Sequence, residues 1–334
     1  TNVSLSPGRL DQYFQPYFEN DMADITDPEE KRKTIERAIE LAACFYMRIS
    51  SHFTATPDAM NYMASGTKSD SAVTLGGITP DGKDAVNDMS YIFLKVTEML
   101  VAQEPNVNVR YHPDITSKTF LSRVCEVNYI TVGTPSLHND KAIFKAFEQH
   151  PEFEIEDIRD WGAVGCVEPS VVGKHTGHTN ALSMNLMSGF EMAMNNGHHP
   201  LIGWDLGPKT GSVEKDEFKT FDQFFDAYMA QMQFLIDNHC DYNKMLGEAH
   251  FQIRPQPFLS AVTVGCIENA RDNTMGGAKY NSSGSFNAGL ADLTDSMLSI
   301  RKFVFDDQVV TFPEMKRAMD DNFEHAPELL ARIK

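Results

Sequence analysis

The chain has 334 residues, of which 42% are apolar and 23% are charged. These values are ordinary for a protein that buries a core, so they exclude a mainly disordered chain. Lys and Arg number 29 against 47 Asp and Glu, and the formal net charge is −18. Such an acidic chain repels phosphate, which disfavours general nucleic-acid binding. The sequence also lacks the polybasic segments and the apolar runs of about 18 residues that indicate membrane binding or a membrane span.

Five cysteines are scattered along the chain and form no Cys-x-x-Cys pair. An odd count in a chain of this size predicts thiols rather than disulfides, which is typical of a reducing cytoplasm, the predicted location. Cys44, Cys125 and Cys240 lie on apolar faces of predicted helices, where we expect packing roles.

The hydrophobic periodicity predicts helices that alternate with short strands. The first helix, at 28–52, has Asp27 as a cap and Glu29 and Glu30 in its first turn. Further helices are predicted at 84–103, 115–128, 140–149, 153–160, 181–196, 221–247 and 313–333, and strands at 107–111, 129–132 and 258–264. This alternation predicts an α/β architecture.

The most informative stretch is residues 161–169, Trp-Gly-Ala-Val-Gly-Cys-Val-Glu-Pro, which we predict to be a loop between two helices. Gly162 and Gly165 allow a tight backbone path that other residues would block. Cys166 and Glu168 are two positions apart, so in extended geometry they point to the same side. A carboxylate beside a thiol suppresses thiolate, which suits a sulfur that reacts as a radical better than a cysteine hydrolase.

Other interpretations of these residues remain open. Cys166 could be a buried structural residue beside a surface Glu168. It could also be the nucleophile of an acyl-transfer enzyme, which would need a nearby His and donors aimed at an oxyanion. His175 and His178 have the spacing of metal ligands on a helix, but no further cysteine or carboxylate completes a site, so no metal is predicted.

Residues 165–169, Gly-Cys-Val-Glu-Pro, resemble the thiyl-radical loop of the glycyl radical enzymes related to pyruvate formate-lyase. Other blocks are similar to the same family, in the same order and over nearly the whole chain. They are Ser-Leu-Ser-Pro-Gly-Arg-Leu-Asp-Gln-Tyr at 4–13, Gly-Gly at 76–77, Asp-Gly-Lys-Asp-Ala-Val-Asn at 81–87, Pro-Ser-Leu-His-Asn-Asp at 135–140, Met-Asn-Asn-Gly at 194–197, Gly-Pro-Lys-Thr-Gly at 207–211, Pro-Phe-Leu-Ser at 257–260, Gly-Cys-Ile-Glu at 265–268 and Gly-Gly-Ala-Lys-Tyr-Asn at 276–281.

This resemblance implies that residues 1–334 are part of a pyruvate formate-lyase-like barrel domain. In that fold ten strands form two half-barrels within an α/β barrel surrounded by helices, and Cys166 would lie on an interior loop. The family carries its glycyl radical near the C-terminus in an Arg-Val-Ser/Ala-Gly-Tyr setting, a string that does not occur here. Because the chain also begins with Thr1, we expect an internal fragment that lacks the glycyl radical domain and is inactive alone.

The resemblance also implies the chemistry. Cys166 would pass its hydrogen to the glycyl radical and then take a hydrogen atom from the substrate, with Glu168 as general acid or base. A radical-SAM activating enzyme would install the radical, the full-length protein would be a homodimer, and no separately bound cofactor is expected. Val167 stands where pyruvate formate-lyase has a second cysteine, which argues against acyl transfer between two thiols.

Five further residues are assigned to substrate binding by the resemblance, Ser4, His178, Asn180, His199 and Glu268. The arylacetate decarboxylases use an upstream Ser, the Cys-Val-Glu loop and a downstream His, which Ser4 and His199 match by spacing. We therefore predict a lyase that cleaves a C–C or C–O bond of a small organic substrate, and we favour an arylacetate-type decarboxylase.

The alternative within the family is a dehydratase or C–N lyase of diol, hydroxyproline or choline type. The diol dehydratases have a His-Ser pair at the place of Val3-Ser4 and an Asp at the place of Asn180, so a diol substrate fits less well. The choline lyases have a Tyr where this chain has Ser183. From another class, a catalytically inert scaffold or binding protein is also considered.

Overall fold

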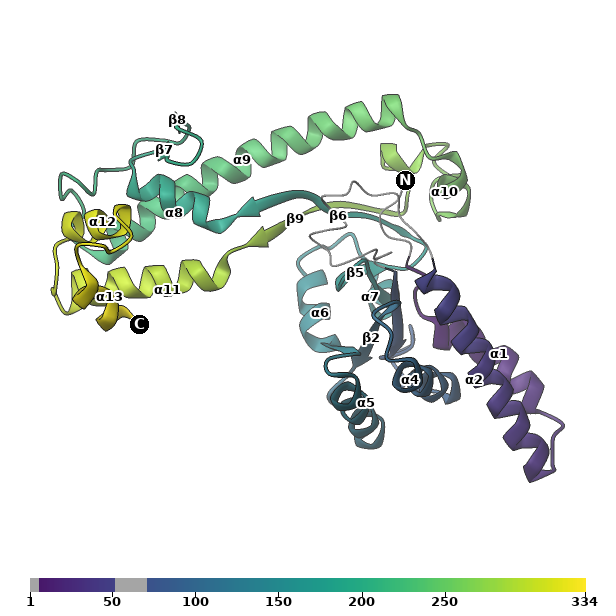
Figure 1. Ribbon diagram of the computed structural model, residues 1–334. Helices are drawn as coiled ribbons and strands as arrows, with labels where there is room; N and C mark the ends of the chain where they lie inside the picture. The colour runs from purple at the N-terminus through teal and green to yellow at the C-terminus, as the bar shows by residue number, and fades with distance from the viewer. Residues whose placement is uncertain (1–5, 52–70) are drawn as a thin grey trace. The chain divides into compact units, whose positions relative to one another are not determined.

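The computed structural model describes residues 6–51 and 71–334, except for the side chains of 178–180. The chain divides into two compact units (Figure 1). Unit 1 comprises Thr1–Thr176 and Pro257–Asn281, and unit 2 comprises Gly177–Gln256 and Ser282–Lys334. Each unit has its own hydrophobic core. No helix in the described ranges has the length and apolar character needed to cross a membrane.

Unit 1 contains a small sheet, helices on both faces of that sheet, and a hairpin. Its helices are α1 (Leu10–Met22), α2 (Pro28–Ser50), α4 (Asp88–Leu100), α5 (Lys118–Thr131), α6 (Asp140–Phe147), α7 (Ile155–Arg159), α10 (Pro257–Val262) and the 3₁₀ turn η1 (Asn273–Met275). Its strands are β1 (Ala72–Gly76), β2 (Asn106–Tyr111), β3 (Ser136–Asn139), β4 (Trp161–Val164) and β5 (Glu168–Val171). The paired strands β6 (His175–Asn185) and β9 (Tyr280–Ala288) belong to both units.

The sheet of unit 1 is parallel, in the order β1-β2-β3, with α4 and α5 as the two crossovers. Parallel neighbours require such crossovers. Successive β1 side chains face opposite sides: Val73 and Leu75 join a core with α1, α2, α4 and α5, whereas Ala72 joins a second core with Trp161 and Ile158. The sheet is therefore covered on both faces, and the predicted α/β class is confirmed.

Side-chain caps set the start of α2, which the sequence predicted, and the start of α4, which the sequence placed at residue 84. The α2 helix begins after Asp27, whose carboxylate accepts a hydrogen bond from Glu30 N at 3.1 Å. Asn87 and Ser90 form a reciprocal capping box at the start of α4. These bonds satisfy main-chain N–H groups that the first turn of a helix leaves without partners.

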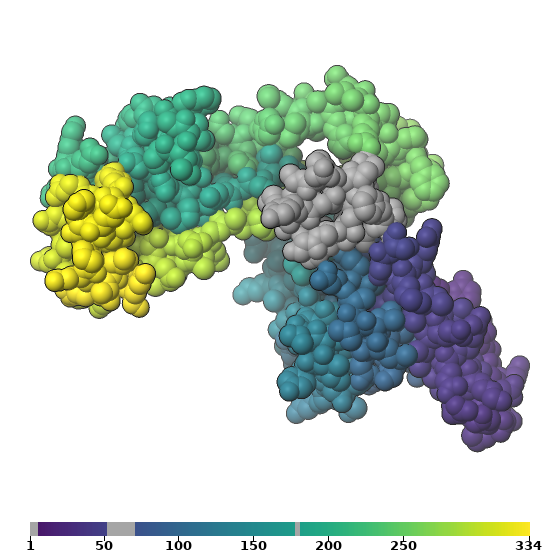
Figure 2. All heavy atoms as spheres, in the orientation of Figure 1, coloured from purple at the N-terminus to yellow at the C-terminus, as the bar shows by residue number. Residues whose placement is uncertain are grey.

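Unit 2 is mainly helical. It contains α8 (Leu186–Met194), α9 (Phe221–Ile253), α11 (Leu290–Ile300), the π-helix η2 (Arg301–Asp306), α12 (Phe312–Asp320), α13 (Pro327–Ile333) and the short strands β7 (His198–His199) and β8 (Trp204–Asp205). Its core is rich in aromatic side chains, and the rings of Phe224 and Phe312 lie 4.9 Å apart at nearly right angles. Figure 2 shows the C-terminal helices and the region around α8 as one continuous surface.

Several elements differ from the sequence prediction, and the helix predicted at 313–333, for example, is two helices, α12 and α13. Residues 129–132 are not a strand, because α5 continues to Thr131 and ends where Val132 adopts a left-handed φ of 59°. Residues 258–264 are not a buried strand: α10 occupies most of them, and Phe258 is 84% exposed. The helix predicted at 181–196 begins only at Leu186, because β6 runs to Asn185.

Candidate active site

Cys166 lies at the tip of the antiparallel β4–β5 hairpin. The register pairs Val164 with Glu168, so only residues 165–167 connect the two strands. Gly165 adopts a left-handed φ of 63°, which a residue with a side chain would adopt only with strain. The predicted loop between helices is thus a hairpin tip, and Glu168 begins its return strand.

The thiol of Cys166 is exposed, as is the side chain of Val167. The interpretation of Cys166 as a buried structural residue is therefore wrong. The resemblance predicts an interior loop, but in the described residues the tip side chains join neither core of unit 1. The described residues therefore do not enclose the Cys166 thiol by themselves.

The hairpin is held through its main chain by side chains from distant segments. Ser6 Oγ accepts a hydrogen bond from Gly165 N at 3.0 Å, and Thr74 Oγ1 accepts one from Ala163 N at 2.8 Å. The Asn106 side-chain amide donates to Gly165 O at 3.2 Å and also to Cys166 O. Residues outside the hairpin therefore hold it at two levels, with Thr74 near its base and Ser6 and Asn106 near its tip.

The Glu168 carboxylate folds back on the tip. Its Oε2 accepts a hydrogen bond from Val167 N at 2.9 Å, and the side chain is half-buried. Oε1 has no hydrogen-bond partner in the part of the chain that the structure describes. One oxygen is thus fixed on the peptide that follows Cys166, while the other is available to exchange a proton.

A buried ion pair fixes the base of the hairpin. Arg110 and Asp140 are fully buried, and the guanidinium donates to both carboxylate oxygens at 2.8 and 3.0 Å. Arg110 also donates to Trp161 O at 2.7 Å, while Trp161 Nε1 donates to Asp140 Oδ1 at 2.9 Å. Burial lowers the pKa of Arg110 to about 10, so the side chain stays charged at neutral pH. These bonds tie the first residue of β4 to β2 and α6.

A second charged cluster joins residues that precede and follow the hairpin in the sequence. Asp157 is buried and forms ion pairs with Lys174 and with Lys279, the latter at 2.7 Å. Tyr280 OH donates to the same carboxylate at 2.7 Å. Burial alone would raise the pKa of Asp157, but these hydrogen bonds outweigh it and lower the pKa to about 2. The Gly-Gly-Ala-Lys-Tyr block thus places its Lys and Tyr in a structural network.

The structure describes only some of the predicted substrate-binding residues. Ser4 lies outside the described residues, and so do the side chains of His178 and Asn180. His199 is buried in unit 2, where its ring accepts a hydrogen bond from Ile202 N at 3.4 Å. Their roles in binding stay predictions.

Glu268 belongs to unit 1, like Cys166 and Glu168. It is exposed, and its carboxylate accepts a hydrogen bond from Gly265 N at 2.9 Å. This bond closes the turn in which Glu268 itself lies. Its contact with substrate stays a prediction.

The remaining cysteines fall into two groups. Cys266 is buried, and burial followed by the charges of Asp272 and Glu268 raises the pKa of its thiol, which suits packing better than nucleophilic chemistry. Cys44, Cys125 and Cys240 are exposed, so the prediction that they pack in cores is wrong. Each occupies the outer side of its helix.

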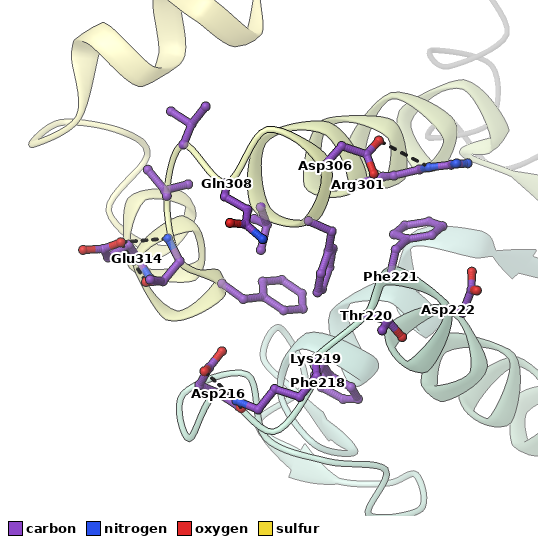
Figure 3. Close-up of a pocket in the computed structure, with 16 residues that line it drawn as sticks. Asp216, Phe218, Lys219, Thr220, Phe221, Asp222, Arg301, Asp306, Gln308 and Glu314 are labelled. Atoms are coloured by element: carbon purple, nitrogen blue, oxygen red, sulfur yellow. Dashed lines mark hydrogen bonds and ion pairs between the residues drawn. The ribbon is translucent and has the colours of Figure 1, made fainter.

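A groove of about 710 Å³ lies within unit 2, near the first turns of α9 and α12 (Figure 3). Four of its charged groups form two ion pairs, Lys219 with Asp216 at 2.7 Å and Arg301 with Asp306 at 3.6 Å. None of the described residues that line it is a cysteine or a histidine. No group of three or more metal-binding side chains occurs in the described residues either. The Cys166 hairpin remains the best candidate for chemistry.

Comparison with known proteins identifies the family. The model of the family described as pyruvate formate lyase-like matches residues 1–334. The chain belongs to this family. It is 32% identical over 327 residues to trans-4-hydroxy-L-proline dehydratase of Clostridioides difficile, covering 96% of this chain and 39% of that protein. It is also 32% identical over 334 residues to (2S)-3-sulfopropanediol dehydratase of Klebsiella oxytoca, covering 99% and 39%.

Solved structures of the family agree. The glycerol-bound form of the B12-independent glycerol dehydratase from Clostridium butyricum matches with a TM-score of 0.87 and 32% identity, over 97% of this chain and 39% of that one. This likeness confirms that the chain has the fold of part of a glycyl radical enzyme barrel. Indoleacetate decarboxylase of Tractidigestivibacter scatoligenes is more distant, at 24% identity over 331 residues. The chain spans about two fifths of the length of these relatives.

Proposed function

We propose that the full-length protein is a glycyl radical lyase that dehydrates a small hydroxylated substrate. The observation that carries the proposal is the hairpin on which an exposed Cys166 thiol and the Glu168 carboxylate are held two residues apart. The choice of dehydration follows the relatives, because the two dehydratases at 32% identity are closer than the decarboxylase at 24%. They favour the dehydratase alternative over the arylacetate substrate that we predicted.

The residues of the tip suit the family's protein-derived radical. A glycyl radical supplies a one-electron oxidant that removes the hydrogen atom of a nearby thiol. Cys166 fits this need because its thiol is accessible and the flanking Gly165 has no side chain to shield it. A neighbouring carboxylate, which would hinder a thiolate, does not hinder transfer of a hydrogen atom.

In the proposed reaction, Cys166 transfers hydrogen atoms and Glu168 transfers a proton. Once Cys166 has lost its hydrogen, its sulfur takes a hydrogen atom from a substrate carbon that carries a hydroxyl or amino group and later returns one. Glu168 takes a proton from that hydroxyl or amino group, and the hydroxyl on the adjacent carbon leaves with this proton as water. Electrons and protons balance, since the proton that Glu168 receives is the one that the leaving group needs.

Two partners complete the proposal. We propose that a radical-SAM activating enzyme installs the glycyl radical, and that the full-length protein acts as a homodimer. Both follow from membership of the family. Light scattering on the full-length protein, alone and with the activating enzyme, measures the two assemblies.

The decisive experiment uses the full-length protein activated under anoxic conditions. Trans-4-hydroxy-L-proline, (2S)-3-sulfopropanediol, glycerol, isethionate, choline and indoleacetate are supplied separately, and products are measured by mass spectrometry. We expect turnover of a hydroxylated compound with release of water. Turnover of indoleacetate alone would restore the decarboxylase interpretation, and a protein that never acquires a glycyl EPR signal would favour an inert scaffold.

Two variants test the assigned residues. Cys166→Ala should abolish turnover while the glycyl EPR signal persists, whereas Cys125→Ala, which removes an exposed thiol on α5, should change neither. Glu168→Gln keeps an acceptor for Val167 N but cannot take a proton, so kcat should fall by about 10²–10⁴-fold. Glu314→Gln is its control, because that carboxylate also accepts a main-chain N–H, from Thr311 at 2.8 Å.

A further inference from the structure

The peptide group between Cys166 and Val167 is bonded at both of its polar ends. Its carbonyl oxygen, Cys166 O, accepts a hydrogen bond from the Asn106 amide. Its N–H, on Val167, donates to Glu168 Oε2 at 2.9 Å. We infer that Asn106 is a positioning residue that orients the Cys166 thiol and the Glu168 carboxylate together. This inference rests on the proposed function of that pair.

The chemistry of an amide explains why Asn suits this position. The Asn106 NH₂ group carries two hydrogens and donates to two successive carbonyls, Gly165 O and Cys166 O. Both peptide planes that flank Cys166 are therefore fixed by one side chain, and with them the direction of the Cα–Cβ bond that carries the sulfur. A carboxylate at the same place would present only acceptors to two carbonyl oxygens.

Asn106 is itself well held, as a positioning residue must be. It begins β2, its main-chain N donates to Ser71 O at 3.0 Å, and it lies opposite Ala72 in the parallel register. Its carbonyl accepts from Asn108 Nδ2 at 3.1 Å, and Asn108 Oδ1 in turn bonds His138 Nε2 at 2.8 Å. The anchor therefore stands on the sheet rather than on a loop.

The other contacts of the hairpin act at different points. Ser6 Oγ holds Gly165 N, and Thr74 Oγ1 holds Ala163 N near the base. These two bonds act on main-chain N–H groups, whereas Asn106 acts on the two carbonyls that flank Cys166. Loss of the Thr74 hydroxyl should loosen the base of the hairpin and lower stability, whereas loss of the Asn106 donors should free the tip.

The test compares Asn106→Asp with two controls in the full-length protein. Asp has nearly the same shape as Asn but cannot donate. Asn238→Asp makes the same replacement on α9, where the amide donates to Phe234 O at 2.8 Å. Thr74→Val is the structural control. Because a misplacement of about 1 Å can cost about 10²-fold in rate, kcat of Asn106→Asp should fall about 10²-fold, with KM changed less than about threefold.

A second readout does not depend on activity. Hydrogen exchange followed by mass spectrometry should become faster for residues 164–168 in Asn106→Asp, while other segments of unit 1 and the glycyl EPR signal stay as in the parent protein. Thr74→Val should lower Tm while leaving kcat within about threefold, since the tip contacts persist. Should Asn106→Asp fail to fold, Asn106→Ser, which can donate only one hydrogen bond, takes its place.

The outcomes separate the two ideas. Unchanged exchange at the tip would overturn the positioning role, as would an unchanged kcat. Faster exchange throughout unit 1 would also overturn it, because the effect would then be general unfolding. If the parent protein acquires its radical but turns over no substrate, the proposed function fails, whereas the exchange result still decides whether Asn106 holds the tip.

Discussion

Replacing Arg110 by Met should destabilise unit 1 strongly. Met matches much of the length of Arg but donates no hydrogen bonds. The replacement would leave Asp140 fully buried with Trp161 Nε1 as its remaining side-chain donor in the described residues. It would also remove the donors that now satisfy Trp161 O and Arg159 O.

The size of the effect follows from these contacts. Removing one partner of a buried ion pair typically costs about 3–5 kcal/mol, because the other charge is left unpaired. Two main-chain carbonyls lose their partners as well, and each such loss adds about 1–3 kcal/mol unless water replaces the donor. We therefore expect the free energy of unfolding of unit 1 to fall by at least about 3 kcal/mol.

Trp161 itself provides the assay. The chain has two tryptophans, and Trp161 is buried in unit 1 whereas Trp204 of unit 2 is 65% exposed. In residues 1–334 carrying Trp204→Phe, Trp161 is the remaining tryptophan, so fluorescence during urea unfolding reports on unit 1. This choice matters because a chain with two units need not unfold in one transition.

A double-mutant cycle separates charge from packing. Asp140→Leu alone leaves a buried guanidinium without its counter-ion, whereas Arg110→Met with Asp140→Leu removes both charges. The double variant should be less destabilised than the sum of the single variants by at least about 1–3 kcal/mol. Strict additivity, or a loss below about 1 kcal/mol for Arg110→Met, would refute the assignment of Arg110 and Asp140 as a coupled buried pair.

Two further predictions concern the elements around the hairpin. Burial lowers the pKa of His175 from 6.5 to about 4, so the stability contributed by the neutral ring is complete above pH 6.5 and is lost as the pH falls towards 4. Between pH 7 and pH 4 the free energy of unfolding of His175→Gln should therefore fall by up to about 3 kcal/mol less than that of the parent protein, as measured by urea unfolding at the two pH values. Gly162→Ala should cost about 1–3 kcal/mol, because the new Cβ would lie 2.9 Å from Val172 Cγ2.

Each of these predictions has an outcome that would contradict it. If His175→Gln lost as much stability between pH 7 and pH 4 as the parent protein, burial of the His175 ring would not be the cause. For Gly162→Ala, the additional change Val172→Ala should restore much of the lost stability. Failure of that rescue would show that the crowding lies elsewhere.

The elements that the sequence predicted correctly carry their own local signals. Asp27 and the acidic first turn set the start of α2, and this pattern needs no tertiary context. The sequence does not predict β1, because all five of its residues are buried and no alternation of polar and apolar residues marks the strand. It predicts a strand at 258–264 because a short apolar segment has no decisive period.

The candidate site shows the same limit. The Gly-Cys-Val-Glu-Pro string and the resemblance predict Cys166 and Glu168 directly as the catalytic residues. Asn106 gave no signal, since it contacts Cys166 across 60 positions of sequence and its partners there are main-chain carbonyls. The pair Arg110 and Asp140 was missed for a similar reason, because only the parallel register brings β2 beside the start of α6.

Within the residues that the structure describes, Val167 contributes its backbone N–H to the anchoring of the hairpin, and its side chain is 47% exposed. Other side chains can therefore replace Val167 more easily than its neighbours, because a new side chain would change the group beside the Cys166 sulfur and leave the hydrogen bonds of the hairpin tip in place. A hairpin with one such tolerant position can gain a different reactivity through a single substitution without losing the contacts that hold it.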